Sequence, residues 1–118
     1  MRTIKFRGKS ALNGKWLFGY LSWYQDPDRF INGKLVDSET VGQFTGLYDV
    51  EGKEIYEGDI VEDNRGNKTL VSYVEEFSAF HQVLYPSSII EFLGTKSLSK
   101  EFIKEAEIKV IGNIYETM

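Results

Sequence analysis

The sequence predicts a mainly β fold built from short antiparallel strands. Aromatic residues make up 14% of the chain, and large flat side chains are more frequent in strands than in helices. Two Asn-Gly dipeptides, Asn13-Gly14 and Asn32-Gly33, suit the turns of two-residue hairpins, because both central residues of such a turn need a positive φ. Turns at such short intervals indicate hairpins and not long crossover connections.

Between the turns, short runs of apolar and aromatic residues are expected to form the strands. Strands are predicted over residues 3–7, 16–23, 60–61, 70–74, 80–83 and 108–115, and residues 30–36 are expected to fold back on themselves around Asn32-Gly33. In the first of them, Ile4 and Phe6 share one face and the polar side chains share the other. Gly19 interrupts the second strand, where it predicts a bulge or a close approach of another segment.

Two further turns are expected in the second half of the chain. Residues 49–52 predict a type I turn closed by Gly52 in the left-handed region. Residues 64–67 predict a turn between two strands of a hairpin. No linker and no internal repeat is visible, so residues 1–118 are expected to form a single domain.

One stretch departs from the β pattern. Leu98 and Phe102 lie four residues apart, as on one face of a helix, and predict a short helix near 98–105. The segment 87–93 is compatible with either a helix or a strand. The expected architecture is therefore antiparallel hairpins with one short helix.

The composition excludes several kinds of protein. The chain has no cysteine, which rules out disulfides and thiolate metal sites and suits a reducing compartment. No apolar run approaches the roughly 20 residues of a membrane span. The N-terminus also lacks the apolar stretch of a signal peptide. A soluble protein in the cytoplasm is therefore expected.

Charge is divided unevenly along the chain. Residues 1–34 carry seven basic and two acidic side chains, a net charge of +5, whereas residues 35–118 carry seven basic and sixteen acidic side chains, a net charge of −9. The division is either accidental or favours head-to-tail self-association, in which the basic part of one copy meets the acidic part of another. The expected partners are further copies of the chain or another, unidentified protein.

Two runs of residues resemble the signature of the YopX family. They are Val41-Gly42-Gln43-Phe44-Thr45-Gly46-Leu47 and Gly52-Lys53-Glu54-Ile55-Tyr56-Glu57-Gly58-Asp59-Ile60-Val61. Parts of 4–21 resemble the opening block of the family and 110–116 its closing block, and the resemblance is weakest over 75–106. It implies a β-rich fold with a part similar to a small SH3-like antiparallel barrel, and a gene carried by a phage or prophage. It implies no catalytic residue and no cofactor.

The second of these runs contains carboxylates that have two interpretations. Gly58 lets the chain turn tightly and Asp59 can accept backbone N–H bonds there, which makes Gly52, Gly58 and Asp59 structural turn residues. Alternatively, Glu54, Glu57 and Asp59 form a metal-binding or acid–base cluster. Residues 54 and 57 face opposite sides of an extended strand, which favours the turn.

The single histidine, His81, lies in the strand predicted at 80–83. A catalytic or metal-binding histidine needs a partner, and the sequence identifies none, so an ordinary strand position explains it more simply. Neither a nucleophile elbow nor a phosphate-binding glycine run occurs. The protein is therefore expected not to be an enzyme and to hold neither a metal nor a cofactor.

Aromatic residues in the N-terminal third form the first candidate interface. They are Trp16, Phe18, Tyr20, Trp23 and Tyr24. With strand alternation the first three share one face while leucines occupy the other, so both faces are apolar. Either the strand is buried on both sides as core, or one face meets a subunit or another partner, because monomers rarely expose a large apolar patch.

Basic residues in the same third form the second candidate surface. They are Arg2, Lys5, Arg7, Lys9 and Lys15. Interleaved with aromatic rings, they could contact the phosphates and bases of a nucleic acid. The overall net charge of −4 argues instead for ordinary solvated strand edges.

The sequence thus leads to three functional hypotheses. The first is a non-enzymatic interaction protein of phage or prophage origin that self-associates or binds a host or phage macromolecule. The second is a nucleic-acid-binding accessory protein that uses the basic N-terminal third. The third is an enzyme whose carboxylates and His81 come together only in the folded chain.

Overall fold

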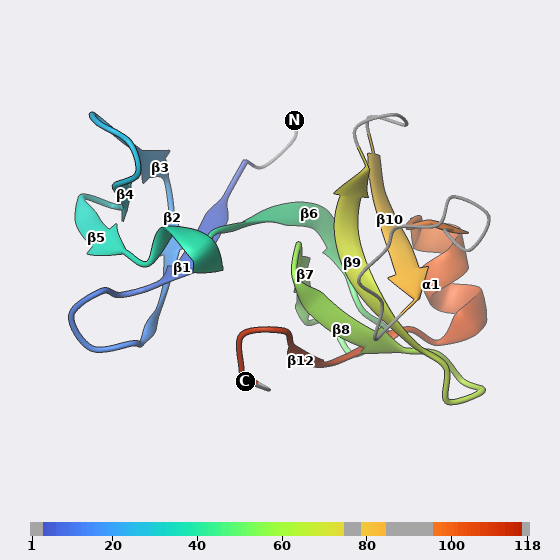
Figure 1. Ribbon diagram of the computed structural model, residues 1–118. Helices are drawn as coiled ribbons and strands as arrows, with labels where there is room; N and C mark the ends of the chain where they lie inside the picture. The colour runs from blue at the N-terminus through green and yellow to red at the C-terminus, as the bar shows by residue number, and fades with distance from the viewer. Residues whose placement is uncertain (1–3, 75–78, 85–95, 117–118) are drawn as a thin grey trace. The chain divides into compact units, whose positions relative to one another are not determined.

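The computed structural model describes residues 4–74, 79–84 and 96–116 and shows a mainly β protein (Figure 1). Its strands pair in antiparallel fashion, which confirms the fold class that the dense turns predict. By its internal contacts the chain divides into two compact units, an N-terminal unit (Met1–Gly46) and a C-terminal unit (Leu47–Met118). Each unit is described by itself.

The N-terminal unit begins with a hairpin. Strand β1 (Phe6–Lys9) pairs with β2 (Trp16–Gly19), and the turn between them is longer than the two-residue turn predicted at Asn13-Gly14. Gly14 has a φ of 72°, but Asn13 does not have the positive φ that a two-residue turn needs. The reason is that the Ser10 carbonyl accepts the N–H of Gly14 at 2.9 Å, which closes a wider turn. On its other side β1 pairs with β6 (Gly42–Tyr48). Strand β1 is therefore a central strand, with β2 and β6 on either side of it.

The first strand lies further along the chain than predicted. The strand expected over 3–7 begins at Phe6 and ends at Lys9, and Ile4, expected to share the face of Phe6, lies outside it with 59% of its surface exposed. The reason is the packing at Gly8, where an added β-carbon would lie 3.2 Å from the side chains of Ile31 and Val36. This close approach centres the packing of β1 on residue 8.

A small sheet completes the N-terminal unit. Its elements are β3 (Leu21–Ser22), β4 (Arg29–Ile31) and β5 (Lys34–Val36), and the 3-10 helix η1 (Ser38–Thr40) leads from there into β6. Asn32 and Gly33, at φ values of 52° and 80°, form the turn between β4 and β5, as the dipeptide predicts. The buried Ile31 and Val36 face Gly8, and this contact is the core of the unit.

The C-terminal unit is built around a five-stranded sheet. Its strands are β8 (Asp59–Glu62), β9 (Lys68–Val74), β10 (Ala79–Leu84), β11 (Lys96–Ser97) and β12 (Lys109–Asn113), in the order β11-β10-β9-β8-β12. Strand β7 (Glu54–Tyr56) lies beside β6 in the other sheet. In the pairings of the described residues the five-stranded sheet has two ends, β11 and β12, so its closure into an SH3-like barrel stays a prediction.

Both turns predicted for the C-terminal unit are present. In the turn over 49–52, the N–H of Gly52 donates to the carbonyl of Asp49 at 3.0 Å, and Gly52 has a φ of 85°. The turn over 64–67 joins β8 to β9, with Gly66 at a φ of 84°. The positive φ values explain why glycine occupies these positions.

The predicted helix is α1 (Lys100–Ala106). Ser99 caps its N-terminus, because the Ser99 hydroxyl accepts the N–H of Phe102 at 3.2 Å. Its buried residue, Ile103, joins the core of the C-terminal unit, which consists of Ile55, Val61, Val71, Leu98, Ile103 and Ile108. The segment 87–93, which the sequence left open between helix and strand, lies outside the described residues.

In the part of the chain that the structure describes, no helix has both the length and the apolar character needed to cross a bilayer.

Candidate interaction surface

Four of the five aromatic side chains singled out in the sequence are exposed. Trp16 is half-buried in β2. The others form what is called here the aromatic surface: Phe18 (49% exposed), Tyr20 (79%), Trp23 (57%) and Tyr24 (89%). The prediction that this stretch is buried as core is therefore wrong for these four residues. The reason is that the strand breaks after Gly19, so that three of them lie outside the paired part of β2.

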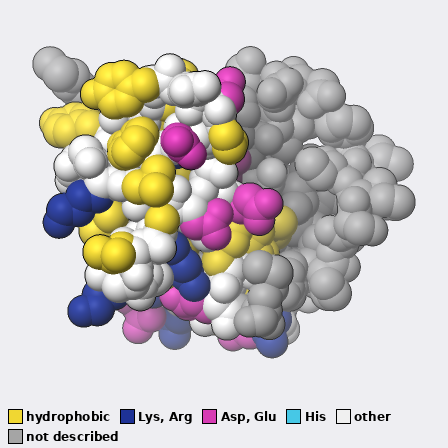
Figure 2. All heavy atoms as spheres, turned by 60° about the vertical axis from the view of Figure 1, so that its left-hand side comes forward, with side chains coloured by type: hydrophobic (Ala, Val, Ile, Leu, Met, Phe, Trp, Pro, Cys, Tyr) yellow, Lys and Arg dark blue, Asp and Glu magenta, His cyan; other side chains and the backbone are white. Residues whose placement is uncertain are grey.

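Figure 2 turns the side of the molecule that carries β1 to β5 towards the viewer. Hydrophobic side chains are spread over this exposed side, with Lys, Arg, Asp and Glu side chains between and around them. Water-exposed rings in this number are unusual for a surface that is in contact with solvent alone.

The side chain of Asn32 holds the backbone that carries Phe18 and Tyr20. Its Oδ1 accepts the N–H of Tyr20 at 3.0 Å, and its Nδ2 donates to the carbonyl of Phe18 at 3.0 Å. The N–H of Asn32 in turn donates to the carbonyl of Tyr20 at 3.0 Å. Gly19 makes this contact possible: its φ is 154°, and an added β-carbon would lie 2.3 Å from the Asn32 side chain. The aromatic surface is thus presented by fixed backbone.

Contacts between neighbouring residues also hold Trp23 and Tyr24. The Arg29 guanidinium lies 5.2 Å from the centre of the Trp23 ring and forms a 2.9 Å ion pair with Asp26. The Tyr24 ring meets Phe30 edge-on, with ring centres 6.0 Å apart. Cation–π and edge-to-face contacts of this kind restrict the rings while leaving much of their surface open to solvent.

The basic candidates divide into stacked and exposed side chains. The Lys5 ammonium lies 5.2 Å from the centre of the Phe44 ring, and Arg7 and Lys9 lie 4.7 Å and 5.5 Å from the centre of the Trp16 ring. Arg7 is only 7% exposed. Lys15 is exposed, and Arg2 lies outside the described residues. Most of the basic groups are therefore already in contact with aromatic rings of the same unit.

The carboxylates of the β7–β8 turn have structural positions. Gly58 has a φ of 93°, and Asp59, 1% exposed, accepts the N–H of Tyr56 on Oδ2 at 2.7 Å. The Tyr56 hydroxyl donates to Glu54 at 3.0 Å. Over the residues that the structure describes, no three acidic or histidine side chains lie close enough together to hold a metal ion.

The backbone of His81 lies within β10, as the sequence predicts. It pairs with Ser72 of β9 on one side and with Ser97 of β11 on the other. Nothing is described of its side chain, so the hypothesis that it meets carboxylates stays a prediction.

A comparison with protein-family models shows which family this chain belongs to. Residues 5–118 match the model described as YopX protein, which covers both units and confirms the resemblance read from the motifs. The chain belongs to the YopX family. The two signature runs of the YopX resemblance correspond to β6 and to the β7–β8 segment. Among curated proteins, no sequence matches the chain.

Sequence reasoning missed two residues that organise this YopX-family fold. Asn32 was predicted only as a turn residue, yet its side chain also binds the backbone on both sides of Gly19, at Phe18 and at Tyr20. Asp49, 5% exposed, accepts the N–H groups of Glu51 and Lys53 at 2.8 Å and 2.9 Å, and its second oxygen accepts the N–H of Val110 at 2.9 Å. The turn chemistry of both was visible in the sequence, but their distant partners were not.

Proposed function

We propose that this YopX-family chain is a non-enzymatic interaction protein that self-associates through its aromatic surface. It is encoded by a phage or prophage and acts in the bacterial cytoplasm. The observation that carries the proposal is the exposure of Phe18, Tyr20, Trp23 and Tyr24 on one short segment. A host or phage protein is the alternative occupant of the same surface.

Physical chemistry favours a protein partner for such a surface. Tyrosine and tryptophan are enriched at protein interfaces, where they bury a large area at a low cost in conformational entropy and supply much of the binding energy. The backbone beneath Tyr20 is already held by Asn32. Less conformational freedom is therefore lost when a partner covers the rings.

A second copy of the chain is the favoured partner because the two units differ in charge. Residues 1–46 carry seven basic and four acidic side chains, a net charge of +3, and residues 47–118 carry seven basic and fourteen acidic side chains, a net charge of −7. The N-terminal unit of one copy therefore attracts the C-terminal unit of another.

Two glutamates in place of exposed tyrosines test the proposal. The chain has a mass of 13.6 kDa, and light scattering is expected to give a larger mass for the wild type. The double variant Tyr20→Glu/Tyr24→Glu is expected to shift the mass towards that of the monomer, because it places charges where rings were covered. Circular dichroism checks that the variant folds, since both side chains are more than three-quarters exposed.

Ile4→Glu is the matched control, because Ile4 is an exposed apolar side chain of the same unit outside the aromatic surface. It is expected to leave the mass unchanged. A wild type that stays monomeric at high concentration would refute self-association. An oligomer that the double variant does not disturb would refute the assignment of the surface.

Nucleic-acid binding is the second candidate, and one observation favours it. Across the β1–β2 pair, Arg7 lies opposite Phe18 and Lys9 lies opposite Trp16, so cations and rings share a face of the sheet. Fluorescence anisotropy with labelled single-stranded and double-stranded DNA at low salt tests it, because phosphate contacts are strongest there. Binding that Lys9→Glu weakens would favour this candidate, and no binding at low salt would eliminate it.

A further inference from the structure

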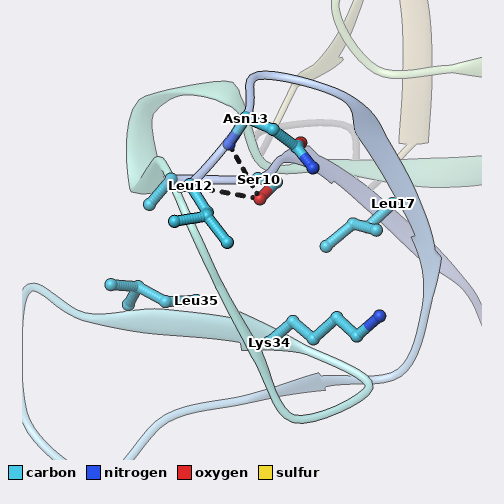
Figure 3. Close-up of a pocket in the computed structure, with 7 residues that line it drawn as sticks. Ser10, Leu12, Asn13, Leu17, Lys34 and Leu35 are labelled. Carbon is cyan, nitrogen blue, oxygen red and sulfur yellow. Dashed lines mark hydrogen bonds between the residues drawn. The ribbon is translucent and has the colours of Figure 1, made fainter.

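A second surface of the N-terminal unit is a groove between its two hairpin turns (Figure 3). Its lining residues are Ser10, Ala11, Leu12, Asn13, Leu17, Lys34 and Leu35, and its volume is about 550 Å³. Leu12 is 93% exposed and Leu35 is 44% exposed. Leu17 follows Trp16 on β2, so the groove opens on the face of that strand opposite to Phe18. It is distinct from the aromatic surface.

The groove is held in shape by hydrogen bonds. The Ser10 hydroxyl accepts the N–H of Leu12 at 3.1 Å and that of Asn13 at 3.4 Å, as the dashed lines of Figure 3 show. The N–H of Ala11 donates to the carbonyl of Leu35 at 3.0 Å and ties one wall to the other. A leucine that is almost fully exposed on a fixed turn is costly in water, and its burial against another apolar side chain would be favourable.

The charge of the groove limits what can occupy it. Among its described lining residues Lys34 is the one charged side chain, and no carboxylate lies beside it. An occupant that combines an apolar side chain with an adjacent carboxylate would therefore match both the leucines and the ammonium group.

The chain itself carries such a segment in its C-terminal unit. In the turn over 49–52, Val50 is 42% exposed and the neighbouring Glu51 is exposed. The buried carboxylate of Asp49 holds this turn by accepting the N–H groups of Glu51 and Lys53. The turn belongs to the unit of net charge −7, and the groove belongs to the unit of net charge +3.

We propose that the groove binds the Val50–Glu51 turn of a second copy of the chain, with Val50 against Leu12 and Leu35 and the Glu51 carboxylate beside the Lys34 ammonium. The proposal rests on the self-association proposed above and adds a second contact to it. Because two different surfaces meet, the contact is heterologous and joins copies head to tail into a ring or a filament.

Charge reversal on each side of the contact, followed by reversal on both, tests the proposal. Lys34→Glu and Glu51→Lys are each expected to weaken association by about three- to tenfold, since each replaces an attraction by a repulsion. The double variant Lys34→Glu/Glu51→Lys restores the attraction with opposite signs and is expected to recover most of the loss. Sedimentation equilibrium of the full chain measures the association constants.

Matched controls separate the local contact from the change in net charge. Lys15→Glu reverses an exposed basic residue of the same unit outside the groove, and Glu105→Lys reverses an exposed acidic residue of α1. Both are expected to change association less than the variants of the groove and turn. Leu12→Gln tests the apolar half of the contact and is expected to weaken association without affecting folding, because Leu12 is 93% exposed.

The outcomes distinguish this inference from the proposed function. A monomeric wild type overturns both. An oligomer whose association constant is unchanged by Lys34→Glu and Leu12→Gln overturns the groove alone and leaves self-association through the aromatic surface standing. The third outcome is that Lys34→Glu weakens association but Glu51→Lys does not, or that the double variant does not recover it. Either result overturns the Val50–Glu51 turn as the occupant and indicates another acidic partner.

Discussion

At the scale of single residues, Asn32 shows how one side chain determines what its neighbours present to solvent. Its positive φ of 52° serves the β4–β5 turn, while its amide group bonds to the backbone of Phe18 and Tyr20. Gly19 complements it, because any larger residue would occupy the space of the Asn32 side chain. The two residues act as a pair, so their substitutions should not be additive.

Gly19→Ala is expected to lower the free energy of unfolding by about 1–3 kcal/mol, through the steric clash with Asn32 and the unfavourable φ. In an Asn32→Gly background the clash is removed, so the additional cost of Gly19→Ala should be smaller. Urea denaturation of the wild type, both single variants and the double variant measures this coupling. Equal costs in the two backgrounds would contradict the pairing of the residues.

Asp63 is expected to make stability depend on acidity. Partial burial raises the pKa of Asp63, but hydrogen bonds to its carboxylate lower it more, so that the pKa lies below the ordinary 3.8. The donors are the backbone and side chain of Asn67 and the backbone of Arg65. The positive charge of Arg65 lowers the pKa further. The unfolded chain therefore binds a proton at this carboxylate more readily than the folded chain does. Asp63 thus adds to the free energy of unfolding above pH 3.8, and this stabilisation is lost as the pH falls through the pKa of the folded state.

The comparison variant is Asp63→Asn, which cannot titrate at this position. The difference in unfolding free energy between wild type and variant should be constant at neutral pH and should shrink in acid below the ordinary pKa of the carboxyl. Denaturant titrations over a series of pH values measure it. A difference that stays the same at every pH would show that the hydrogen bonds do not depend on the charge.

At the scale of elements, turns and caps position the strands. The turn over 49–52 does more than reverse the chain, because the buried Asp49 also binds the N–H of Val110 in β12, 61 residues away. Ser99 similarly sets the start of α1, whose Ile103 reaches the core. These polar residues join particular strands and helices through directional hydrogen bonds. Apolar packing alone would fix the alignment of these elements less specifically.

Asp49→Ala is expected to lower the free energy of unfolding by about 2–4 kcal/mol, because it removes an acceptor shared by three backbone N–H groups and leaves part of them unsatisfied. Glu51→Ala is the control from the same turn, with an expected effect within about 0.5 kcal/mol because Glu51 is exposed. Chemical denaturation compares the two. Similar costs for both variants would show that the Asp49 hydrogen bonds add little.

At the scale of the whole molecule, the division of charge between the units is the main feature that bears on assembly. A net charge of +3 on residues 1–46 and of −7 on residues 47–118 gives copies of the chain a preferred head-to-tail approach. The aromatic surface and the groove both belong to the positive unit. Apolar contact and charge attraction therefore act together on the same side of the proposed interface.

Raising the salt concentration is expected to weaken self-association, because ions screen the attraction between units of opposite charge. Light scattering of the wild type should give a mass that falls from about 50 mM to about 500 mM sodium chloride. The variant Lys34→Glu should show a weaker dependence, since it has lost one attractive charge. A mass that rises with salt would indicate that apolar contact alone drives association.

Much of the fold could be predicted because its signals are local. The Asn32-Gly33 turn, the turns ending in Gly52 and Gly66, and the helix near 98–105 all lie where the sequence placed them. Asn13-Gly14 also lies between two strands, but in a longer turn than the dipeptide predicts. The terminal strand was also predicted, and the exposed Ile111 fits an alternation that turns Ile108 and Val110 inward. The buried Asn113 does not fit it, because a bulge between Val110 and Gly112 shifts the register of the strand. A bulge depends on the partner strand, which a single segment does not reveal.

The amino-acid sequence by itself determined where this chain reverses direction, because a positive φ is a requirement of one residue and its immediate neighbours. Only the tertiary structure decided which apolar side chains are covered. Trp16 and Tyr20 look alike in the sequence, yet the first is half-buried and the second is 79% exposed. Burial depends on which distant segments come to lie against a strand, and the residue that binds the backbone of Tyr20 is Asn32, twelve residues further along the chain.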